Sequence, residues 1–165
     1  MDVLAAPVQP TLVMAIAESP ERLRAIGMLF REYASALGGE TRIADLVEEL
    51  RGLPGPYAGP RGALLLAEEA GRPAGCVAVR ELDVETCEMR RMFVRHPFRG
   101  RGFGRTLASA AIQHARVAGF TTIRLHLAPW MTEAVALYRT LGFTEIAQYR
   151  EVLLGNAVFM ELRLV

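Results

Sequence analysis

The sequence predicts one α+β domain in which helices flank a mixed, mostly antiparallel sheet. Its 165 residues, 52% of them hydrophobic and 22% charged, are enough for one globular core. In the middle of the chain, three strand-like segments follow one another with short turns between them, which favours an antiparallel meander. In the second half, helical segments separate the strands and permit parallel pairing as well. We expect residues 1–10 to form a flexible tail and residues 11–165 to form the domain.

The first third of the chain predicts a strand, two helices and a loop. Ser19 is a good N-cap residue and Pro20 suits the first helical position, so a helix should begin there. Glycines end both predicted helices. The segment at 52–61, which follows the second helix, contains three glycines and three prolines, which predict an irregular loop around Tyr57. The expected elements are a strand at 11–17, helices at 20–37 and 43–50, and the loop at 52–61.

The remaining elements follow from apolar periodicity and from the glycines that interrupt it. The expected strands are 63–70, 74–82, 86–94, 121–127, 143–149 and 158–165. The expected helices are 105–118, which ends at Gly119, and 132–141, which ends at Gly142. The complete order is βααβββαβαββ.

Charge is distributed unevenly along the chain. Residues 1–88 contain eight arginines and fourteen acidic residues, whereas residues 89–165 contain eleven arginines and four glutamates. All 19 basic residues are arginine, which excludes Walker-type phosphate loops and lysine Schiff-base enzymes. Such a composition is typical of a GC-rich genome and favours a bacterial origin.

Cysteine and histidine usage predicts neither a disulfide nor a metal site. Cys76 and Cys87 both lie in strand-like apolar patterns, as expected for core thiols in a reducing cytoplasm. His96, His114 and His126 lack metal-ligand spacing. The longest uncharged run, residues 3–17, is too short for a membrane span, and no signal peptide is expected.

The most informative segment is MFVRHPFRGRGFGRTL, residues 92–107, in which a strand leads through a glycine-rich loop into a helix. Glycine permits positive φ, so successive amides can converge on one anion at the positive end of the helix dipole. Four arginines surround this loop, with no carboxylate nearby in sequence to neutralise them. The pattern predicts a pyrophosphate site. The loop residues concerned are Gly100, Gly102 and Gly104, with Arg95, Arg99, Arg101 and Arg105.

Two alternatives remain open from spacing alone. The loop could be a solvated arginine-rich turn. It could also be a nucleic-acid patch, although only Phe98 and Phe103 supply the exposed aromatic residues that such a patch favours. The dinucleotide fingerprint G-x-G-x-x-G fails, because neither Arg105 nor Leu107 is a glycine.

Two motifs resemble the GNAT superfamily of N-acetyltransferases. Arg99, Gly102 and Gly104 match its acetyl-CoA signature, Arg/Gln-x-x-Gly-x-Gly/Ala, and EAVALYRTLGFTEI at 133–146 resembles its downstream element. The resemblance implies the GNAT acyl-CoA N-acyltransferase fold, with acetyl-CoA as co-substrate and no metal. It implies direct acetyl transfer to an amine, which a small molecule, a peptide N-terminus or a protein side chain could carry. A non-catalytic CoA-binding module is the alternative.

The resemblance also assigns roles to particular residues. The main chain of Met92, Phe93 and Val94 would pair with pantetheine, and Arg99 would support the loop. Amides between residues 100 and 106 would hold the pyrophosphate; the positions concerned are Gly100, Arg101, Gly102, Gly104, Arg105 and Thr106. Met131 stands where many members have an asparagine, and Thr132 is expected to cap the helix in its place.

Tyr138 and Glu88 correspond to catalytic positions of the family. The family's tyrosine faces the thioester sulfur of acetyl-CoA, and its glutamate acts as general base in some members. Tyr138 would donate to the thiolate, or only pack the helix. A general base needs a raised pKa, whereas Arg90, which strand alternation places on the same face as Glu88, Met92 and Val94, would lower it. Base and ion-pair partner therefore both remain open. His126 is a second candidate base.

Acceptor contacts are expected from the first two helices and from the loop at 52–61. Glu40, Asp45, Glu48 and Glu49 suggest a cationic amine, or only the solvated face of a helix. Tyr33 and Tyr57 are candidates for the walls of the acceptor cleft, although Tyr33 lies on an apolar stripe. We expect no nucleic-acid or membrane partner and a cytoplasmic location, and a homodimer remains open.

Overall fold

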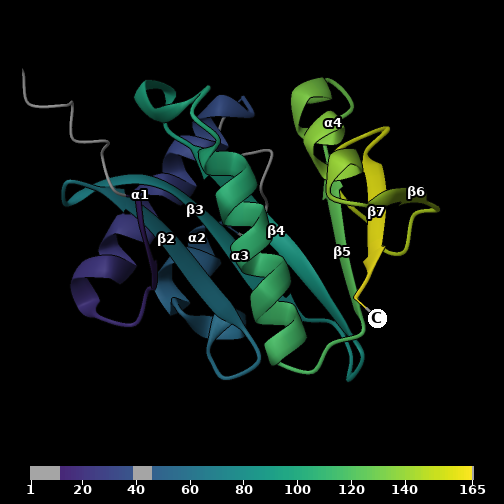
Figure 1. The fold of residues 1–165 in the computed structure, drawn as a ribbon, viewed down its shortest axis with the longest axis horizontal. Helices are drawn as coiled ribbons and strands as arrows, with labels where there is room; N and C mark the ends of the chain where they lie inside the picture. Colours follow the sequence, from purple (N-terminus) through teal and green to yellow (C-terminus); the bar gives the residue numbers. More distant parts are fainter. Residues whose placement is uncertain (1–11, 39–45, 165) are drawn as a thin grey trace, which may run out of the picture.

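The computed structural model describes residues 12–38 and 46–164, and its main feature is one seven-stranded sheet (Figure 1). The strand order is β1-β2-β3-β4-β5-β7-β6. All neighbouring strands are antiparallel except β4 and β5, which are parallel. The strands are β1 (Leu12–Ile16), β2 (Ala63–Glu69), β3 (Arg72–Glu81), β4 (Thr86–Val94), β5 (Thr122–Leu127), β6 (Thr144–Ile146) and β7 (Val158–Arg163).

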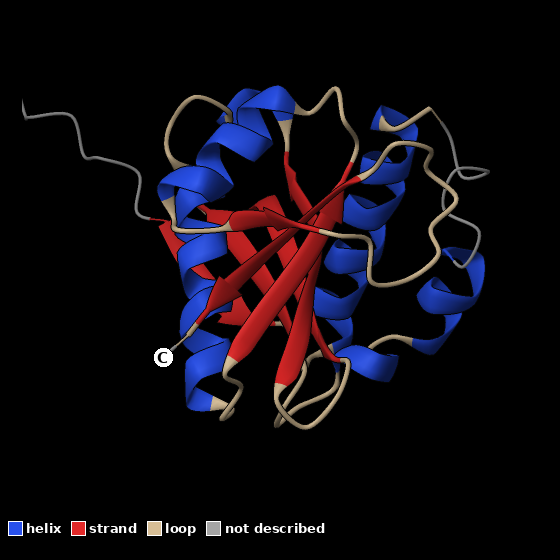
Figure 2. Cartoon of the chain, turned by 90° about the vertical axis from the view of Figure 1, so that its right-hand side faces the viewer, coloured by secondary structure: helices blue, strands red, loops and turns tan. Residues whose placement is uncertain are grey.

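Helices cover both faces of the sheet (Figure 2). One face packs against α3 (Phe103–Val117) and α4 (Thr132–Thr140). The other packs against α1 (Pro20–Ala36) and α2 (Leu46–Gly52). Each face has its own apolar core, centred on side chains such as Leu107 and Ile123 on the first face and Phe30 and Leu66 on the second.

Local signals in the sequence located most element boundaries. The Ser19 hydroxyl accepts a hydrogen bond from the Arg22 amide at 3.2 Å, and α1 has proline at its first position, as predicted. The antiparallel meander of β2, β3 and β4 is also confirmed. The predicted tail and the start of the second helix lie outside the described residues.

Two local predictions were wrong. The strand expected at 143–149 is only Thr144–Ile146, because the chain then leaves the sheet to approach β4 through Tyr149. Thr132 does not cap α4; it is the first helical residue, and Met131 occupies the cap position without a side-chain cap bond.

The alternation predicted for β4 is broken by a bulge. Arg91 has φ 56°, and the register with β3 shifts between Cys76 and Ala78. A bulge inserts one extra residue and exchanges the faces beyond it. Met92 therefore packs on the α3 side, whereas Phe93 packs on the α1 side. The expectation that Glu88, Met92 and Val94 share one face is corrected accordingly.

The two central strands separate toward the end of β4. Their parallel pairing involves only the three pairs from Thr86↔Thr122 to Glu88↔Arg124. Figure 1 shows β4 and β5 adjacent at the bottom and apart at the top, where α3 and α4 begin. The opening creates the site described below.

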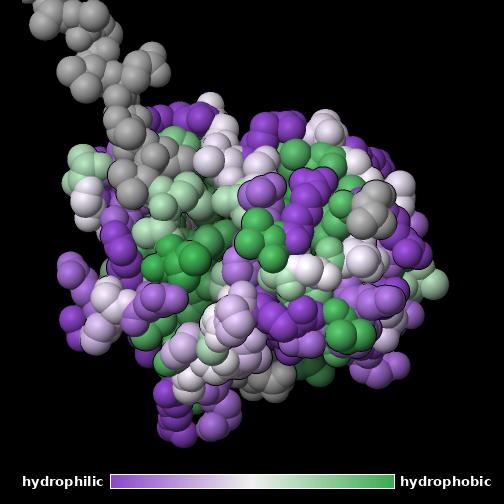
Figure 3. Space-filling model, turned by 60° about the horizontal axis from the view of Figure 1, so that its bottom comes forward, coloured by the Kyte–Doolittle hydropathy of each residue, from purple (hydrophilic) through white to green (hydrophobic). Residues whose placement is uncertain are grey.

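Exposed apolar residues on the face drawn in Figure 3 gather mainly left of centre, and hydrophilic residues separate the others. Among the residues that the structure describes, no helix is long and apolar enough to cross a membrane.

Candidate active site

A cleft of about 740 Å³ occupies the opening between β4 and β5. The end of β4 and the starts of α3 and α4 form its walls, and the end of α1 adds Tyr33. The cleft thus brings together segments that are far apart in the sequence. It includes most residues predicted to bind acetyl-CoA: Met92, Phe93, Val94, Arg99, Gly100, Gly102, Gly104 and Arg105 line it.

The glycine-rich loop presents free main-chain amides to this cleft. Gly100 and Gly102 have φ of 73° and 83°, which strongly favours glycine. Helix α3 begins at Phe103, and the Thr106 amide donates to the Gly102 carbonyl at 3.1 Å. The amides between Gly102 and Arg105 therefore precede the hydrogen bonds of the helix and are available to an anion.

Two details of the predicted loop are corrected. Gly104 has no positive φ; it lies in the first turn of α3, where an added Cβ would lie 3.5 Å from Leu137. The Thr106 amide is already used within the helix, and its hydroxyl also donates to the Gly102 carbonyl. Thr106 therefore supports the loop from within rather than offering an amide to a ligand.

The arginines around the loop fall into two pairs. Contrary to the sequence prediction, two are neutralised: Arg95 binds Glu32 at 2.7 Å and Arg101 binds Glu69 at 2.8 Å. The other two, Arg99 and Arg105, line the cleft and bind uncharged oxygens. Arg99 donates to the Val94 carbonyl at 2.9 Å, and Arg105 to the Thr140 hydroxyl at 2.6 Å. Arg99 thus supports the end of β4.

The end of β4 offers an unpaired edge. Since β5 pairs with β4 only as far as Glu88, the β5-facing main chain of Met92, Phe93 and Val94 borders the cleft. An extended ligand could pair with this edge as an added strand would.

Tyr138 lies on α4, almost buried, with its ring 5.5 Å from that of Phe143. Burial raises the pKa of Tyr138, and the neighbouring Tyr33, which lines the cleft, raises it further. The hydroxyl is therefore protonated at neutral pH and able to donate. Whether it reaches the sulfur stays a prediction.

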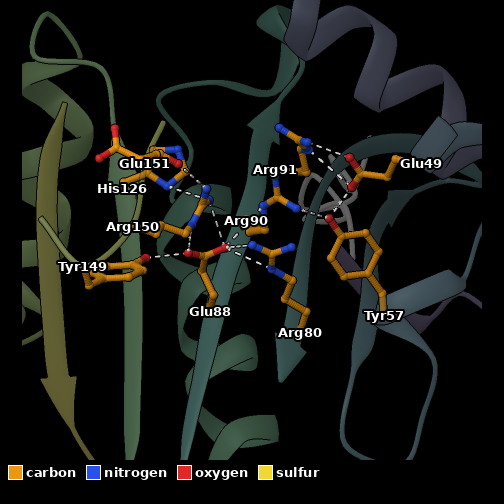
Figure 4. Close-up of polar contacts among 10 residues, drawn as sticks. All are labelled: Glu49, Tyr57, Arg80, Glu88, Arg90, Arg91, His126, Tyr149, Arg150 and Glu151. Carbon is orange, nitrogen blue, oxygen red and sulfur yellow. Dashed lines mark hydrogen bonds and ion pairs between the residues drawn. The ribbon is translucent and has the colours of Figure 1, made fainter. Parts of the chain in front are cut away.

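Glu88 is fully buried among arginines (Figure 4). Its oxygens lie 2.8 Å from Arg80, 3.4 Å from Arg90 and 2.9 Å from Arg150, and Tyr149 donates to it at 2.5 Å. Burial alone would raise the pKa of Glu88, but hydrogen bonds from Arg150 and Tyr149 and the arginine charges outweigh it and lower the pKa to about 2.

A general base working near neutral pH needs a pKa near 6–7. The environment of Glu88 shifts its pKa in the opposite direction and favours the role of ion-pair partner. Its role as base stays a prediction. His126 is close by, since Arg150 approaches its Nδ1 at 3.3 Å. Burial and the Arg150 charge lower the pKa of His126 to about 4, so its imidazole is neutral but weakly basic.

The acidic segment of α2 has partners of its own. Glu49 binds Arg91 at 2.6 Å and accepts from the Tyr57 hydroxyl, to which Arg90 also donates at 3.1 Å. Tyr57 is buried and packs on Phe30. Glu49 is therefore internal rather than available to a cationic acceptor. Glu48 is exposed and pairs with Arg51, and Glu40 and Asp45 lie outside the described residues.

Comparison with known proteins identifies the family. Residues 28–143 match the family model described as Acetyltransferase (GNAT) family. An uncharacterized N-acetyltransferase of Schizosaccharomyces pombe is 31% identical over 147 residues, which are 88% of this chain and 90% of the relative. The Escherichia coli N-acetyltransferase YjgM is 29% identical over 136 residues, 81% of this chain and 80% of the relative. The chain belongs to the GNAT family. It is an acetyl-CoA-dependent N-acetyltransferase, as the motifs predicted.

Solved structures confirm the GNAT fold. A GNAT acetyltransferase of Staphylococcus aureus superimposes with a TM-score of 0.76 at 16% identity. The match covers 94% of this chain and 100% of the other chain. The Salmonella typhimurium acetyltransferase yncA, solved with its cofactor acetyl-CoA, superimposes with a TM-score of 0.70 at 22% identity. The match covers 93% of this chain and 94% of yncA. Spermidine N-acetyltransferase of Vibrio cholerae, in complex with CoA and spermine, superimposes with a TM-score of 0.68 at 21% identity. The match covers 92% of this chain and 95% of the other.

The cleft of this GNAT enzyme suits acetyl-CoA. The free amides at Gly102–Arg105 and the side chains of Arg99 and Arg105 form a donor set for a pyrophosphate. In the part of the chain that the structure describes, no group of three or more His, Cys, Asp or Glu side chains could hold a metal.

Sequence reasoning missed four residues that contact Glu88 or Glu49 beside the cleft strand: Arg80, Arg91, Tyr149 and Arg150. Arg91 was hidden by the bulge, because simple alternation places it on the opposite face from Glu88. Arg150 comes from 62 residues further along the chain, a separation that no local pattern connects. The one available signal was the cluster of arginines in β4, which required carboxylate partners elsewhere.

Proposed function

We propose that acetyl-CoA binds in the cleft and passes its acetyl group directly to an amine that enters from the α1 and α2 side of β4. The pyrophosphate would bind the amides between Gly102 and Arg105, flanked by Arg99 and Arg105. Pantetheine would pair with the edge of Met92–Val94. The observation that carries this proposal is the cleft, which joins a positive-φ glycine loop to an unpaired strand edge.

The cysteines support direct transfer. The chain has two, and both side chains are fully buried. Burial raises the pKa of Cys76 well above its usual range and that of Cys87 to about 12. A thiolate is needed to form an acetyl-cysteine intermediate, so neither residue is suited to carry the acetyl group.

The chemistry requires stabilisation of two developing charges. Main-chain amides near Val94 would donate to the carbonyl oxygen of the thioester as it becomes an oxyanion. The protonated hydroxyl of Tyr138 would donate to the departing thiolate. The acceptor must lose a proton, and Glu88 and His126, with pKa values near 2 and 4, are weak bases for it. We propose that the acceptor reacts as the neutral amine formed in solvent.

The finer features of the function rest on the sequence. Bacterial origin and cytoplasmic location follow from the arginine-only composition and from the cysteines, and they remain predictions, as does a homodimer. The acceptor is an amine on a small molecule or a peptide.

A thiol-release assay with acetyl-CoA and a broad panel of amines tests the proposal. We expect sustained release that depends on the amine, with intersecting lines in double-reciprocal plots, because both substrates bind before direct transfer. Parallel lines would contradict direct transfer. Tight acetyl-CoA binding with no release from any amine would favour the non-catalytic module.

A further inference from the structure

The face of β4 that α1 and α2 cover carries an excess of positive charge. Four guanidinium groups gather there, drawn together in Figure 4: Arg80, Arg90, Arg91 and Arg150. Over residues 12–38 and 46–164, two carboxylates bind them, Glu49 and Glu88. Glu49 is paired with Arg91, so Glu88 is left with three guanidinium groups.

The contacts of Glu88 show that its binding capacity is already used. Its Oε1 accepts from Arg80 at 2.8 Å and from Arg150 at 3.2 Å, and lies 3.4 Å from Arg90. Its Oε2 accepts from Arg150 at 2.9 Å and from Tyr149 at 2.5 Å. One negative charge therefore serves three positive charges.

The surplus charge is only partly exposed to solvent, since the side chains of Arg80 and Arg150 are 24% and 28% exposed. The side chain of Arg90 is only 12% exposed, and its other partner is the uncharged hydroxyl of Tyr57. His126, beside Arg150, is neutral at pH 7. Holding an ion pair together requires one arginine, and additional buried cations around the same carboxylate repel each other. An anion from outside the cluster would relieve this repulsion.

The surplus lies along the strand whose end borders the cleft, and apart from the pyrophosphate loop. Along β4, Arg90 precedes Phe93, which lines the acetyl-CoA cleft, by three residues. In Figure 4, Arg150 and Arg90 both lie above the Glu88 carboxylate, Arg150 to its left and Arg90 to its right. The pyrophosphate loop belongs to the α3 side of the sheet, whereas Arg90 contacts Tyr57 on the α2 side. The two basic regions would therefore bind different groups.

We infer that the acceptor amine carries an oxyanion, a carboxylate or a phosphate, that binds between Arg90 and Arg150. The inference rests on the proposed acetyl transfer and specifies its substrate class. It replaces the cationic acceptor suggested by the acidic segment, since Glu49 is consumed by Arg91 and Tyr57.

Matched acceptor pairs test this inference through kcat/KM. Suitable pairs are phenylalanine with phenethylamine, 4-aminobutyrate with butylamine, and phosphoethanolamine with ethanolamine, together with spermine. Because charge-assisted hydrogen bonds are strong, kcat/KM for at least one acceptor with the carboxylate or phosphate should exceed that of its partner without this group by about tenfold or more. The pair that shows the preference distinguishes carboxylate from phosphate.

Variants connect the preference to the cluster. Arg150→Gln should reduce the kcat/KM ratio between the acceptor with the carboxylate or phosphate and its partner without this group by about tenfold, and Arg150→Lys should restore part of that ratio. Arg163→Gln is the matched control, because this arginine is 74% exposed and pairs with Glu161. Circular dichroism and acetyl-CoA affinity verify that each variant is folded.

The outcomes separate the inference from the proposed function. Equal rates within every pair, a preference for spermine, or an unchanged ratio in Arg150→Gln would overturn the inference, while thiol release would still support acetyl transfer. No thiol release from any amine, despite bound acetyl-CoA, would contradict the proposed function and with it the inference.

Discussion

The Tyr138 hydroxyl is a donor at neutral pH, since a phenol ordinarily titrates near 10 and burial raises the pKa of Tyr138 further. Tyr138→Phe preserves the packing on Phe143 and removes only the donor. We expect turnover to fall by about 10–100-fold, as for the loss of one transition-state hydrogen bond. The free energy of unfolding should change by no more than about 1 kcal/mol.

Tyr149→Phe is the matched control for that experiment. It also removes one hydroxyl, but this hydroxyl donates to Glu88 at 2.5 Å. Its loss should lower the free energy of unfolding by about 1.5–3 kcal/mol, the range for a hydrogen bond to a charged group. A wild-type rate for Tyr138→Phe with a good acceptor would leave Tyr138 a packing role only.

Glu88 illustrates how an environment decides between two roles for one side chain. A carboxylate with a pKa of about 2 titrates far below the working range of the enzyme. We therefore expect the acid limb of the kcat/KM profile to persist in Glu88→Gln. The limb should move with the acceptor's own pKa when a less basic amine is used, because the neutral amine is the reacting form.

The opposite result would restore Glu88 as general base. In that case Glu88→Gln should lower the rate by roughly 10²–10⁴-fold and abolish the acid limb. The acceptor's pKa would then have no effect on the limb.

At the scale of elements, the glycine-rich loop depends on main-chain conformation rather than on side chains. Gly102 lines the cleft with φ 83°, and an added Cβ would meet no protein atom within 4 Å. Gly102→Ala should weaken acetyl-CoA binding by about tenfold or more, because the methyl group occupies anion space and the left-handed conformation becomes strained. Calorimetry measures the affinity.

Gly71→Ala controls for strain alone. Gly71 has φ 74° in the turn between β2 and β3, also with no atom within 4 Å of an added Cβ. Both variants should lose a similar free energy of unfolding, about 1–2 kcal/mol. Unchanged acetyl-CoA affinity in folded Gly102→Ala would contradict the pyrophosphate assignment. An equal loss of acetyl-CoA affinity in Gly71→Ala would contradict it as well.

The elements also show which features were predictable from sequence. The loop before α3 is local: glycines, arginines and a helix start within a few residues, so its position was predicted correctly. The bulge at Arg91 was not predictable, because alternation gives no sign of an extra residue. The Glu88 cluster depends on Arg150 across 62 residues, and only the fold brings the two together.

For the whole molecule, that cluster joins the two halves of the sheet. Strands β4 and β5 share only three residue pairs before they separate. Beyond them, the segment between β6 and β7 returns to β4 through the bonds of Tyr149 and Arg150 to Glu88. The opening that we propose to hold acetyl-CoA thus has a polar connection on the other face of the sheet.

This connection should make the fold sensitive to acid. The pKa of Glu88 is about 2, against an ordinary value of 4.5. The stabilisation is complete above about pH 4.5, where the unfolded carboxyl is also ionised, and is lost as the pH falls toward 2. At 1.36 kcal/mol per pKa unit, it amounts to about 3 kcal/mol.

His126 adds an earlier stage of the same sign. The pKa of His126 is about 4 in the folded chain, against an ordinary value of 6.5. Between these two pH values the imidazole is therefore protonated in the unfolded chain and neutral in the folded chain, which destabilises the fold. Urea unfolding of the wild type should therefore show stability falling from about pH 6.5 downward, with a further loss below about pH 4.5. His126→Gln should remove the first stage and Glu88→Gln should reduce the second. Constant stability of the wild type between pH 7 and 4 would contradict the neutral state of the half-buried His126. An undiminished second stage in Glu88→Gln would contradict the assignment of that stage to Glu88.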